Sequence, residues 1–118
     1  MKFKWSDLWN VGEHLRKYSK KEEFQRSAVG RYYYACFLTA RDYYEAENKK
    51  PLVKFDSHNT LIKFFITSYE KDHNEIGRKL IILRKYRNTA DYEENFQNII
   101  VNKSQEESKK LIKILEGL

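Results

Sequence analysis

The sequence predicts an all-α protein of a single domain over residues 1–118. Four glycines and one proline are too few for the many turns of a β-sandwich. Apolar residues recur at the three- and four-residue steps that place side chains on one helix face. A chain of this length buries roughly two-thirds of its unfolded surface, so it can form a core without cross-links. We therefore expect one bundle of about five helices.

The first two helices are predicted from caps and apolar spacing. Ser6 is the expected N-cap of the first helix. The segment Ser19–Glu22 has the S-x-x-E pattern of a capping box and predicts a long second helix that runs to about Asn48. Gly30, in the middle of that helix, costs about 1 kcal/mol of helix stability relative to alanine. A close helix crossing at Gly30 would explain why the helix carries a glycine there. The predicted core-facing residues are Leu8, Val11, Leu15 and Tyr18 in the first helix, and two stripes in the second, Phe24, Ala28, Tyr32, Ala35, Thr39 and Tyr43 beside Val29, Tyr33, Phe37, Ala40 and Tyr44.

The remaining helices follow a break at Asn48–Pro51. A third helix is expected from about Ser57 to Tyr69. A capping box at Asp72–Glu75 predicts the start of the fourth helix, and the polar stretch Glu93–Lys103 is expected to be a loop. A further capping box at Ser104–Glu107 predicts the start of a last helix. The residues expected to be buried in that helix are Leu111, Ile114 and Leu115.

Arg87 occupies a position where the fourth helix should carry an apolar residue. The stripe that contains it consists of Ile76, Leu80, Leu83, Arg87 and Ala90. A guanidinium keeps its proton at ordinary pH, so on a core-facing stripe it needs an anionic partner. Asp91, four residues later, can supply one within the chain. A phosphate or a carboxylate of another protein can supply one from outside.

Three segments, in order along the chain, resemble small HEPN-domain proteins. Arg31–Phe37, with the sequence RYYYACF, resembles their R-x-Y-Y-A-x-F segment. Ser57-His58, followed by Leu61 and Phe64, is similar to their H-x-x-apolar third helix. Arg87–Tyr92, RNTADY, matches the R-x-x-A-D-Y end of their fourth helix. The resemblance covers roughly residues 24–92 and a trailing amphipathic helix.

This resemblance implies a helical bundle that forms a homodimer, with the polar motifs of two subunits facing one cleft. Family members are often encoded beside a minimal nucleotidyltransferase or act in toxin–antitoxin and phage-defence systems. Many are metal-independent endoribonucleases whose motif is an arginine followed, after four to six residues, by a histidine. The corresponding positions after Arg87 hold Tyr92, Glu93 and Glu94, and those after Arg84 hold Thr89, Ala90 and Asp91. None of them is a histidine.

The motif residues therefore favour phosphate binding over cleavage. Arg87 and Arg84 can each hold a phosphate, since a guanidinium presents two parallel N–H donors. Asp91, with a reference pKa near 3.9, is a weak base and a weaker acid, and Tyr92, with a reference pKa near 10, is a poor base. Arg31, with Arg26, and Lys85 could extend a basic RNA-binding surface.

Two function hypotheses follow. The first is an RNA-directed HEPN protein of a prokaryotic toxin–antitoxin or phage-defence system. Its candidate catalytic residues are Arg87, Asp91 and Tyr92, and its candidate RNA-binding residues are Arg84, Arg31 and Lys85. The second is a non-catalytic subunit that docks a nucleotidyltransferase, with the Arg87–Asp91 pair in a structural role. Binding of a small nucleotide in the cleft is a third alternative.

Each candidate also has a structural interpretation. Arg84 can be a solvated surface residue. Tyr92 can close the helix end with its ring on the core, or be a site of nucleotide attachment as in some related systems. The tyrosines at 32–34 can pack in the core or stack on RNA bases. The histidines, His14, His58 and His73, lie on three different helices, so we expect them to form neither a metal site nor a catalytic base.

Composition adds several expectations. The chain has 23 Lys and Arg against 17 Asp and Glu, and its net charge of +6 favours polyanionic partners. Cys36 is the single cysteine, which excludes an internal disulfide and predicts a small buried apolar residue. There is no Gly-rich phosphate loop, so no cofactor is expected. No apolar stretch resembles a signal peptide or a membrane span, and we expect a cytoplasmic protein.

Overall fold

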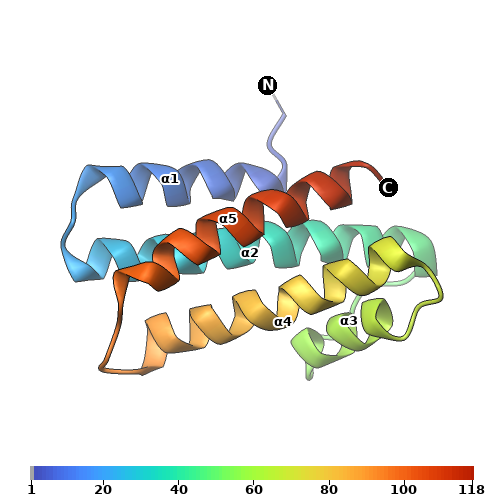
Figure 1. The fold of residues 1–118 in the computed structure, drawn as a ribbon. Coiled ribbons are helices and arrows are strands. Elements are labelled where there is room, and N and C mark those ends of the chain that lie inside the picture. Colours follow the sequence, from blue (N-terminus) through green and yellow to red (C-terminus); the bar gives the residue numbers. More distant parts are fainter. Residues whose placement is uncertain (1) are drawn as a thin grey trace.

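The computed structural model describes residues 2–118 and is all-helical, as the sequence predicts. A short 3-10 helix, Trp5–Asp7, leads into α1 (Leu8–Tyr18), and four more α-helices follow. They are α2 (Glu22–Asn48), α3 (Ser57–Ile66), α4 (Lys71–Tyr92) and α5 (Asn98–Glu116). Figure 1 shows α1, α2, α4 and α5 running lengthwise, with the short α3 beside α4. Among the described helices none is both long and apolar enough to cross a membrane.

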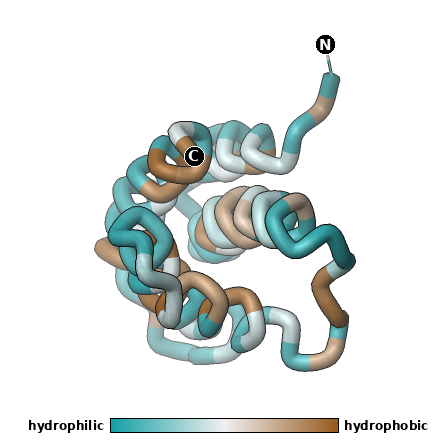
Figure 2. Tube along the Cα trace, turned by 90° about the vertical axis from the view of Figure 1, so that its right-hand side faces the viewer, coloured by the Kyte–Doolittle hydropathy of each residue, from teal (hydrophilic) through white to brown (hydrophobic). Residues whose placement is uncertain are grey.

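The helix at the centre of the bundle is α2, as its wide apolar face predicts. It packs against α1, α4 and α5, and the end-on view of Figure 2 shows the other helices curving around it. Both of its predicted stripes are buried or half-buried, and Cys36 is fully buried between them. The fully buried α2 side chains are Ala28, Val29, Tyr32, Tyr33, Ala35, Cys36 and Ala40.

The predicted close crossing at Gly30 is wrong, because an added Cβ there would meet nothing within 4 Å. Close approach occurs at two other glycines instead. A Cβ on Gly12 of α1 would lie 2.8 Å from Cε1 of Tyr32, and one on Gly77 of α4 would lie 2.8 Å from the side chain of Ile66. The glycines of α1 and α4 therefore let α1 approach α2, and α4 approach α3.

The buried face of the first helix is rotated from the predicted one: Leu8 and Leu15 are half-buried as predicted, and Leu15 packs on the core. Val11 and Tyr18 are exposed, Tyr18 to 70%. The buried face is centred on Gly12 and includes Trp9, whose Nε1 donates a hydrogen bond of 2.9 Å to Ser108 Oγ. The indole has more apolar surface than valine and a donor that needs an acceptor, so its placement sets the rotation of α1. Ser6 is not the N-cap, since it lies within the 3-10 helix that precedes α1.

The predicted starts of α2, α4 and α5 are also displaced, whereas α3 begins at Ser57 as predicted. The Ser19 hydroxyl accepts a hydrogen bond from the backbone N–H of Lys21, and α2 begins at Glu22. Likewise α4 begins at Lys71, one residue before the Asp72 that was expected to cap it. Ser104 is a fully buried residue inside α5, so most of the stretch expected to be a loop is helical. A buried serine inside a helix lets a neighbouring helix approach closely. Such a serine can also be followed three residues later by a glutamate, so the S-x-x-E pattern does not distinguish it from an N-cap.

The end of α3 also differs from the prediction. The helix stops at Ile66 rather than near Tyr69. The side-chain amide of Asn74 donates to the backbone carbonyls of Phe65, Ile66 and Ser68, at 3.0, 3.1 and 2.9 Å. Because these hydrogen bonds satisfy carbonyls that a longer helix would have used, the chain turns directly into α4.

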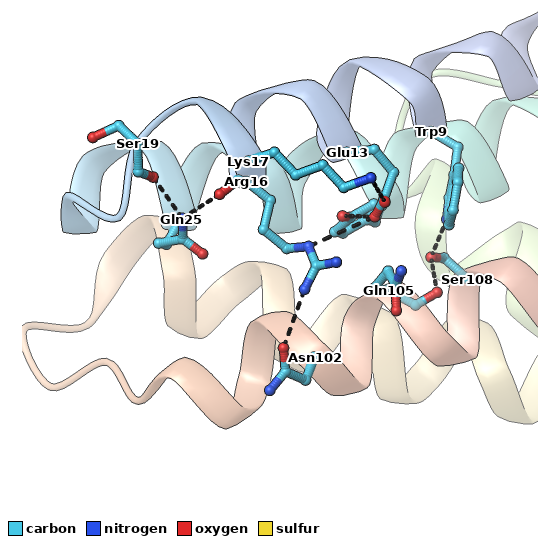
Figure 3. A network of polar contacts seen from close by, with 10 residues as sticks. Trp9, Glu13, Arg16, Lys17, Ser19, Gln25, Asn102, Gln105 and Ser108 are labelled. Carbon is cyan, nitrogen blue, oxygen red and sulfur yellow. Dashed lines mark hydrogen bonds and ion pairs between the residues drawn. The ribbon is translucent and has the colours of Figure 1, made fainter.

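Polar contacts join α1 to α2 and α5, as Figure 3 shows. Arg16 Nη1 donates to Asn102 Oδ1 at 3.3 Å, and Gln25 Nε2 donates to the backbone carbonyls of Arg16 and Ser19. The Glu13 carboxylate lies within ion-pair distance of both Arg16 and Lys17. The arginine in this network therefore has an acidic partner and a structural role.

Arg26 joins the start of α2 to the end of α4. Its ion pair with Glu22 is 2.9 Å long. Its guanidinium also donates to the carbonyls of Ala90, Glu93 and Glu94, at 2.9, 2.6 and 2.7 Å. These acceptors are the unpaired carbonyls at a helix C-terminus and the loop after it. Arg26 therefore caps α4 and is not free to extend a basic cleft.

Candidate functional site

Arg87 lies on the buried face of α4, as the apolar spacing predicts. The stripe at Ile76, Leu80, Leu83, Arg87 and Ala90 is buried throughout, and Arg87 is only 9% exposed. Its guanidinium carbon lies 5.4 Å from the ring centroid of Tyr33 and 5.6 Å from that of Tyr34. Nη1 donates to Asp91 Oδ2 over 3.4 Å, and Nε is buried without an acceptor. The internal pair therefore exists, and it leaves part of the guanidinium unsatisfied.

Arg84, one turn earlier on α4, is half-buried. Its Nη1 donates to Asn59 Oδ1 of α3 over 2.7 Å, and its Nε is buried without an acceptor. Within residues 2–118 no carboxylate lies within ion-pair distance of Arg84. The two guanidinium groups of Arg84 and Arg87 thus have one carboxylate between them, that of the partly exposed Asp91, which pairs with Arg87.

His58, at the start of α3, lies beside this arginine pair. Its ring stacks on Phe37 with centroids 4.3 Å apart, and its Nδ1 is hydrogen-bonded to Tyr33 Oη. Burial, which is the larger cause, and the positive charges of Arg84 and Arg87 together lower the pKa of His58 to about 4. The imidazole is therefore neutral at physiological pH.

Sequence reasoning missed this histidine, although it lies in one of the three segments that resemble HEPN proteins. The chain separates His58 from Arg87 by a loop and most of two helices, so no periodicity joins them. The available signal was the H-x-x-apolar resemblance of the segment that begins at Ser57-His58, and it does not connect this histidine with Arg87. The structure brings the α2, α3 and α4 segments together at one place.

The three consecutive tyrosines divide between two surroundings. Tyr32 is buried toward α1, where its hydroxyl is hydrogen-bonded to Glu13. Tyr33 is fully buried between His58 and Arg87, and burial raises its pKa, so its hydroxyl stays protonated. Tyr34 is half-buried beside the same guanidinium. Two of the three thus form the aromatic wall of the site.

The other predicted site residues lie on the surface. Tyr92 is 76% exposed, so the expectation that its ring packs on the core is wrong. Asp91 is exposed apart from its contact with Arg87, and Lys85 is exposed on α4. Arg31 is exposed on α2, and no hydrogen bond or ion pair of the described residues joins it to the arginine pair.

Two adjoining hollows follow the outer side of α4, and we call them together the α4 groove. The first, about 350 Å³ in volume, is lined by Asn59, Ile62, Ile81, Arg84, Lys85 and Asn88. The second, about 590 Å³, is lined by Lys85, Asn88, Thr89, Tyr92 and Glu93. Lys85 and Asn88 line both hollows. Both hollows are open to solvent.

The chemistry of this arrangement suits an anion. Guanidinium groups with unused donors bind a phosphate by charge-assisted hydrogen bonds. Among the described residues no group of three His, Cys, Asp or Glu side chains could hold a metal ion. The arginine side chains are the groups of this arrangement that could hold an anion.

Comparisons with known proteins identify a relative of unknown activity. No family model matches the sequence, and no solved structure matches it. The chain is 34% identical over 102 residues to the uncharacterized protein MJ0628 of Methanocaldococcus jannaschii, in an alignment that covers 74% of this chain and 61% of that protein. The chain thus spans about three-fifths of the length of this relative. The chain is thus an all-helical bundle protein. The relative of known source is archaeal and uncharacterized.

Proposed function

We propose that this protein binds the phosphate backbone of RNA at Arg84 and Arg87, as a HEPN-like protein of a prokaryotic toxin–antitoxin or phage-defence system. The observation that carries the proposal is the pair of buried Nε donors without acceptors on adjacent turns of α4. Leaving a buried donor unsatisfied costs about 1–3 kcal/mol, and more for a charged group. A phosphate bound by the two guanidinium groups would supply the anionic partner that Arg84 lacks and that Arg87 has only in the partly exposed Asp91.

The α4 groove supports RNA as the polyanion. Exposed Lys85 lies between its two hollows, and the exposed ring of Tyr92 at its far end offers a face on which a base can stack. The net charge of +6 favours encounter with a polyanion over the whole molecule. By the HEPN resemblance we further expect a homodimer in which two such grooves face one cleft.

The test is binding of a fluorescein-labelled single-stranded oligouridylate, measured by fluorescence anisotropy in EDTA. We expect the double variant Arg84→Gln/Arg87→Gln to bind at least about tenfold more weakly. We also expect the slope of log K against log salt to fall by roughly 0.7 for each phosphate that the variant no longer neutralises.

The matched control is Lys20→Gln/Lys109→Gln, which removes the same charge from exposed positions on other parts of the surface. If the control weakens binding as much as the arginine variant does, RNA binding is non-specific and the proposed site is wrong. Gel analysis of the same samples with natural RNA reports cleavage, and Arg87→Ala separates cleavage by this protein from contamination.

A second candidate function rests on Tyr92. Its phenol is exposed at the end of the arginine-bearing helix, which fits a site where a partner nucleotidyltransferase attaches a nucleotide. The test is co-expression with a minimal nucleotidyltransferase of the kind that the HEPN resemblance implies as a partner, followed by intact-protein mass spectrometry. A mass increase of one nucleoside monophosphate, absent in Tyr92→Phe, would favour this docking function. An unchanged mass would count against it.

A further inference from the structure

His58 is held beside the arginine pair by contacts from two helices. On α2, Phe37 stacks on its ring and the Tyr33 hydroxyl is hydrogen-bonded to Nδ1. On α4, Arg84 donates to Asn59, the residue that follows His58. The imidazole is therefore positioned at the edge of the site that we assign to phosphate.

The charges that act on His58 come from α4. Arg84 and Arg87 both disfavour its protonated form, in addition to burial. Asp91 lies beyond Arg87 and pairs with it. On α2 the facing titratable groups are the phenols at 33 and 34. On α3 the Asp56 carboxylate precedes the helix and accepts a hydrogen bond from Asn59.

We propose that His58 is a third ligand of the phosphate bound by Arg84 and Arg87, and that it takes up a proton from solvent when the phosphate binds. This inference rests on the proposed function. Since Tyr33 occupies Nδ1, Nε2 is the ring nitrogen left for a ligand. The imidazolium carries a proton on each nitrogen and can donate to phosphate through Nε2. The Tyr33 hydroxyl can accept as well as donate, so its hydrogen bond survives protonation.

The physical cause is the change of charge in the site. A phosphodiester brings a negative charge to the guanidinium groups and so reduces the repulsion that keeps His58 neutral. Linkage is reciprocal, so protonation of His58 must strengthen phosphate binding by the same factor. Binding should therefore become tighter as the pH falls.

The probe is an oligouridylate with 2′-O-methyl sugars, which cannot be cleaved through its 2′-oxygens and whose own groups do not titrate between about pH 5 and pH 8. If the phosphate restores an ordinary histidine pKa, affinity rises about 30-fold from pH 8 to pH 5. Because burial is the larger cause of the low pKa and remains in the complex, we expect a rise of about 3-fold to 30-fold.

Two variants isolate the contribution of His58. His58→Gln should lose most of this pH dependence, because glutamine keeps a polar side chain that does not titrate. His14→Gln, at an exposed position on α1, should keep it. Equal pH dependence in His58→Gln and the natural protein would overturn the inference.

A measurement on the natural protein makes the test independent of how the variants fold. NMR titration of the imidazole Cε1–H of His58, with and without saturating oligouridylate, should show its pKa rising toward the ordinary value for histidine. Arginine-dependent binding without this rise would overturn the role of His58 and leave the proposed function standing. Absence of binding at every pH would overturn both.

Discussion

Replacing Arg87 with methionine should leave the stability of the fold unchanged or slightly raised. Arg26→Met is the matched comparison, since both variants remove one arginine charge from a helix of the same bundle and keep an unbranched apolar side chain. We expect Arg26→Met to be strongly destabilising. The difference separates an arginine held ready for a ligand from one with a structural role.

For Arg87→Met we expect almost no change in the free energy of unfolding, because the contributions that are lost and gained nearly cancel. The ion pair with partly exposed Asp91 contributes about 0.5 kcal/mol. The two aromatic contacts of the guanidinium contribute about 1–2 kcal/mol together. Against these favourable contributions, the variant removes a buried donor without an acceptor, which costs about 1–3 kcal/mol. A methionine sulfur can also pack against the rings of Tyr33 and Tyr34.

Arg26 has no such balance, because its donors are satisfied by Glu22 and by carbonyls of the α4 C-terminus. Removing these charge-assisted hydrogen bonds costs about 3 kcal/mol. A chain of this length unfolds with an entropy of about 0.25 kcal/mol/K, so each kcal/mol shifts Tm by about 4 °C. We therefore expect Tm to fall by about 12 °C for Arg26→Met, and to change little for Arg87→Met.

The assay is thermal unfolding followed by far-ultraviolet circular dichroism, with the oligouridylate anisotropy measurement on the same samples. Arg87→Met should keep its Tm and lose RNA binding. A fall in Tm of more than about 8 °C would refute the reasoning, since it would mean that the pair with Asp91 holds the fold together. The docking hypothesis with a structural arginine would then be the better one.

Three further predictions concern the helices and pH. Gly30→Ala should raise Tm by about 2–4 °C in the same assay, because the position is open and alanine favours helix; a fall would mean that something packs there. Gly12→Ala should lower Tm by about 4–8 °C, because its Cβ would overlap the buried ring of Tyr32; an unchanged Tm would show that the ring moves at little cost. His58 has a lowered pKa in the folded state, so the unfolded chain binds its proton first and stability falls as pH drops from about 6.5 to 4; in urea titrations this part of the loss should be absent from His58→Gln.

The fold was largely predictable because hydrophobic periodicity reports directly on helix faces. The buried stripe of α4, including Arg87, and the wide face of α2 lie where spacing places them. The helix starts predicted from caps were wrong, because S-x-x-E can also place a serine inside a helix, as at Ser104, whereas the start of α3 at Ser57 was predicted. The rotation of α1 was not predictable, because it depends on an indole finding an acceptor on α5, 99 residues away.

The candidate site was predictable in part. The arginine on the apolar stripe and its pair with Asp91 follow from local spacing along one helix. The position of His58 depends on how α3 packs on α2 and α4, which no local pattern encodes. The resemblance includes His58 in the H-x-x-apolar third helix, but the catalytic histidine that it describes follows the arginine on the same helix, so it gives His58 no role beside Arg87.

The way α3 is attached has a consequence for motion. This helix of 10 residues packs mostly on α4 and contacts α2 over a short stretch. The segment before it contains two non-glycine residues in the left-handed region, Lys49 and Asp56, each of which costs energy to hold. We therefore expect the amide hydrogens of α3 to exchange with solvent faster than those of the three long helices. If so, α3, which carries His58, can move away from the site and back while the rest of the bundle stays folded.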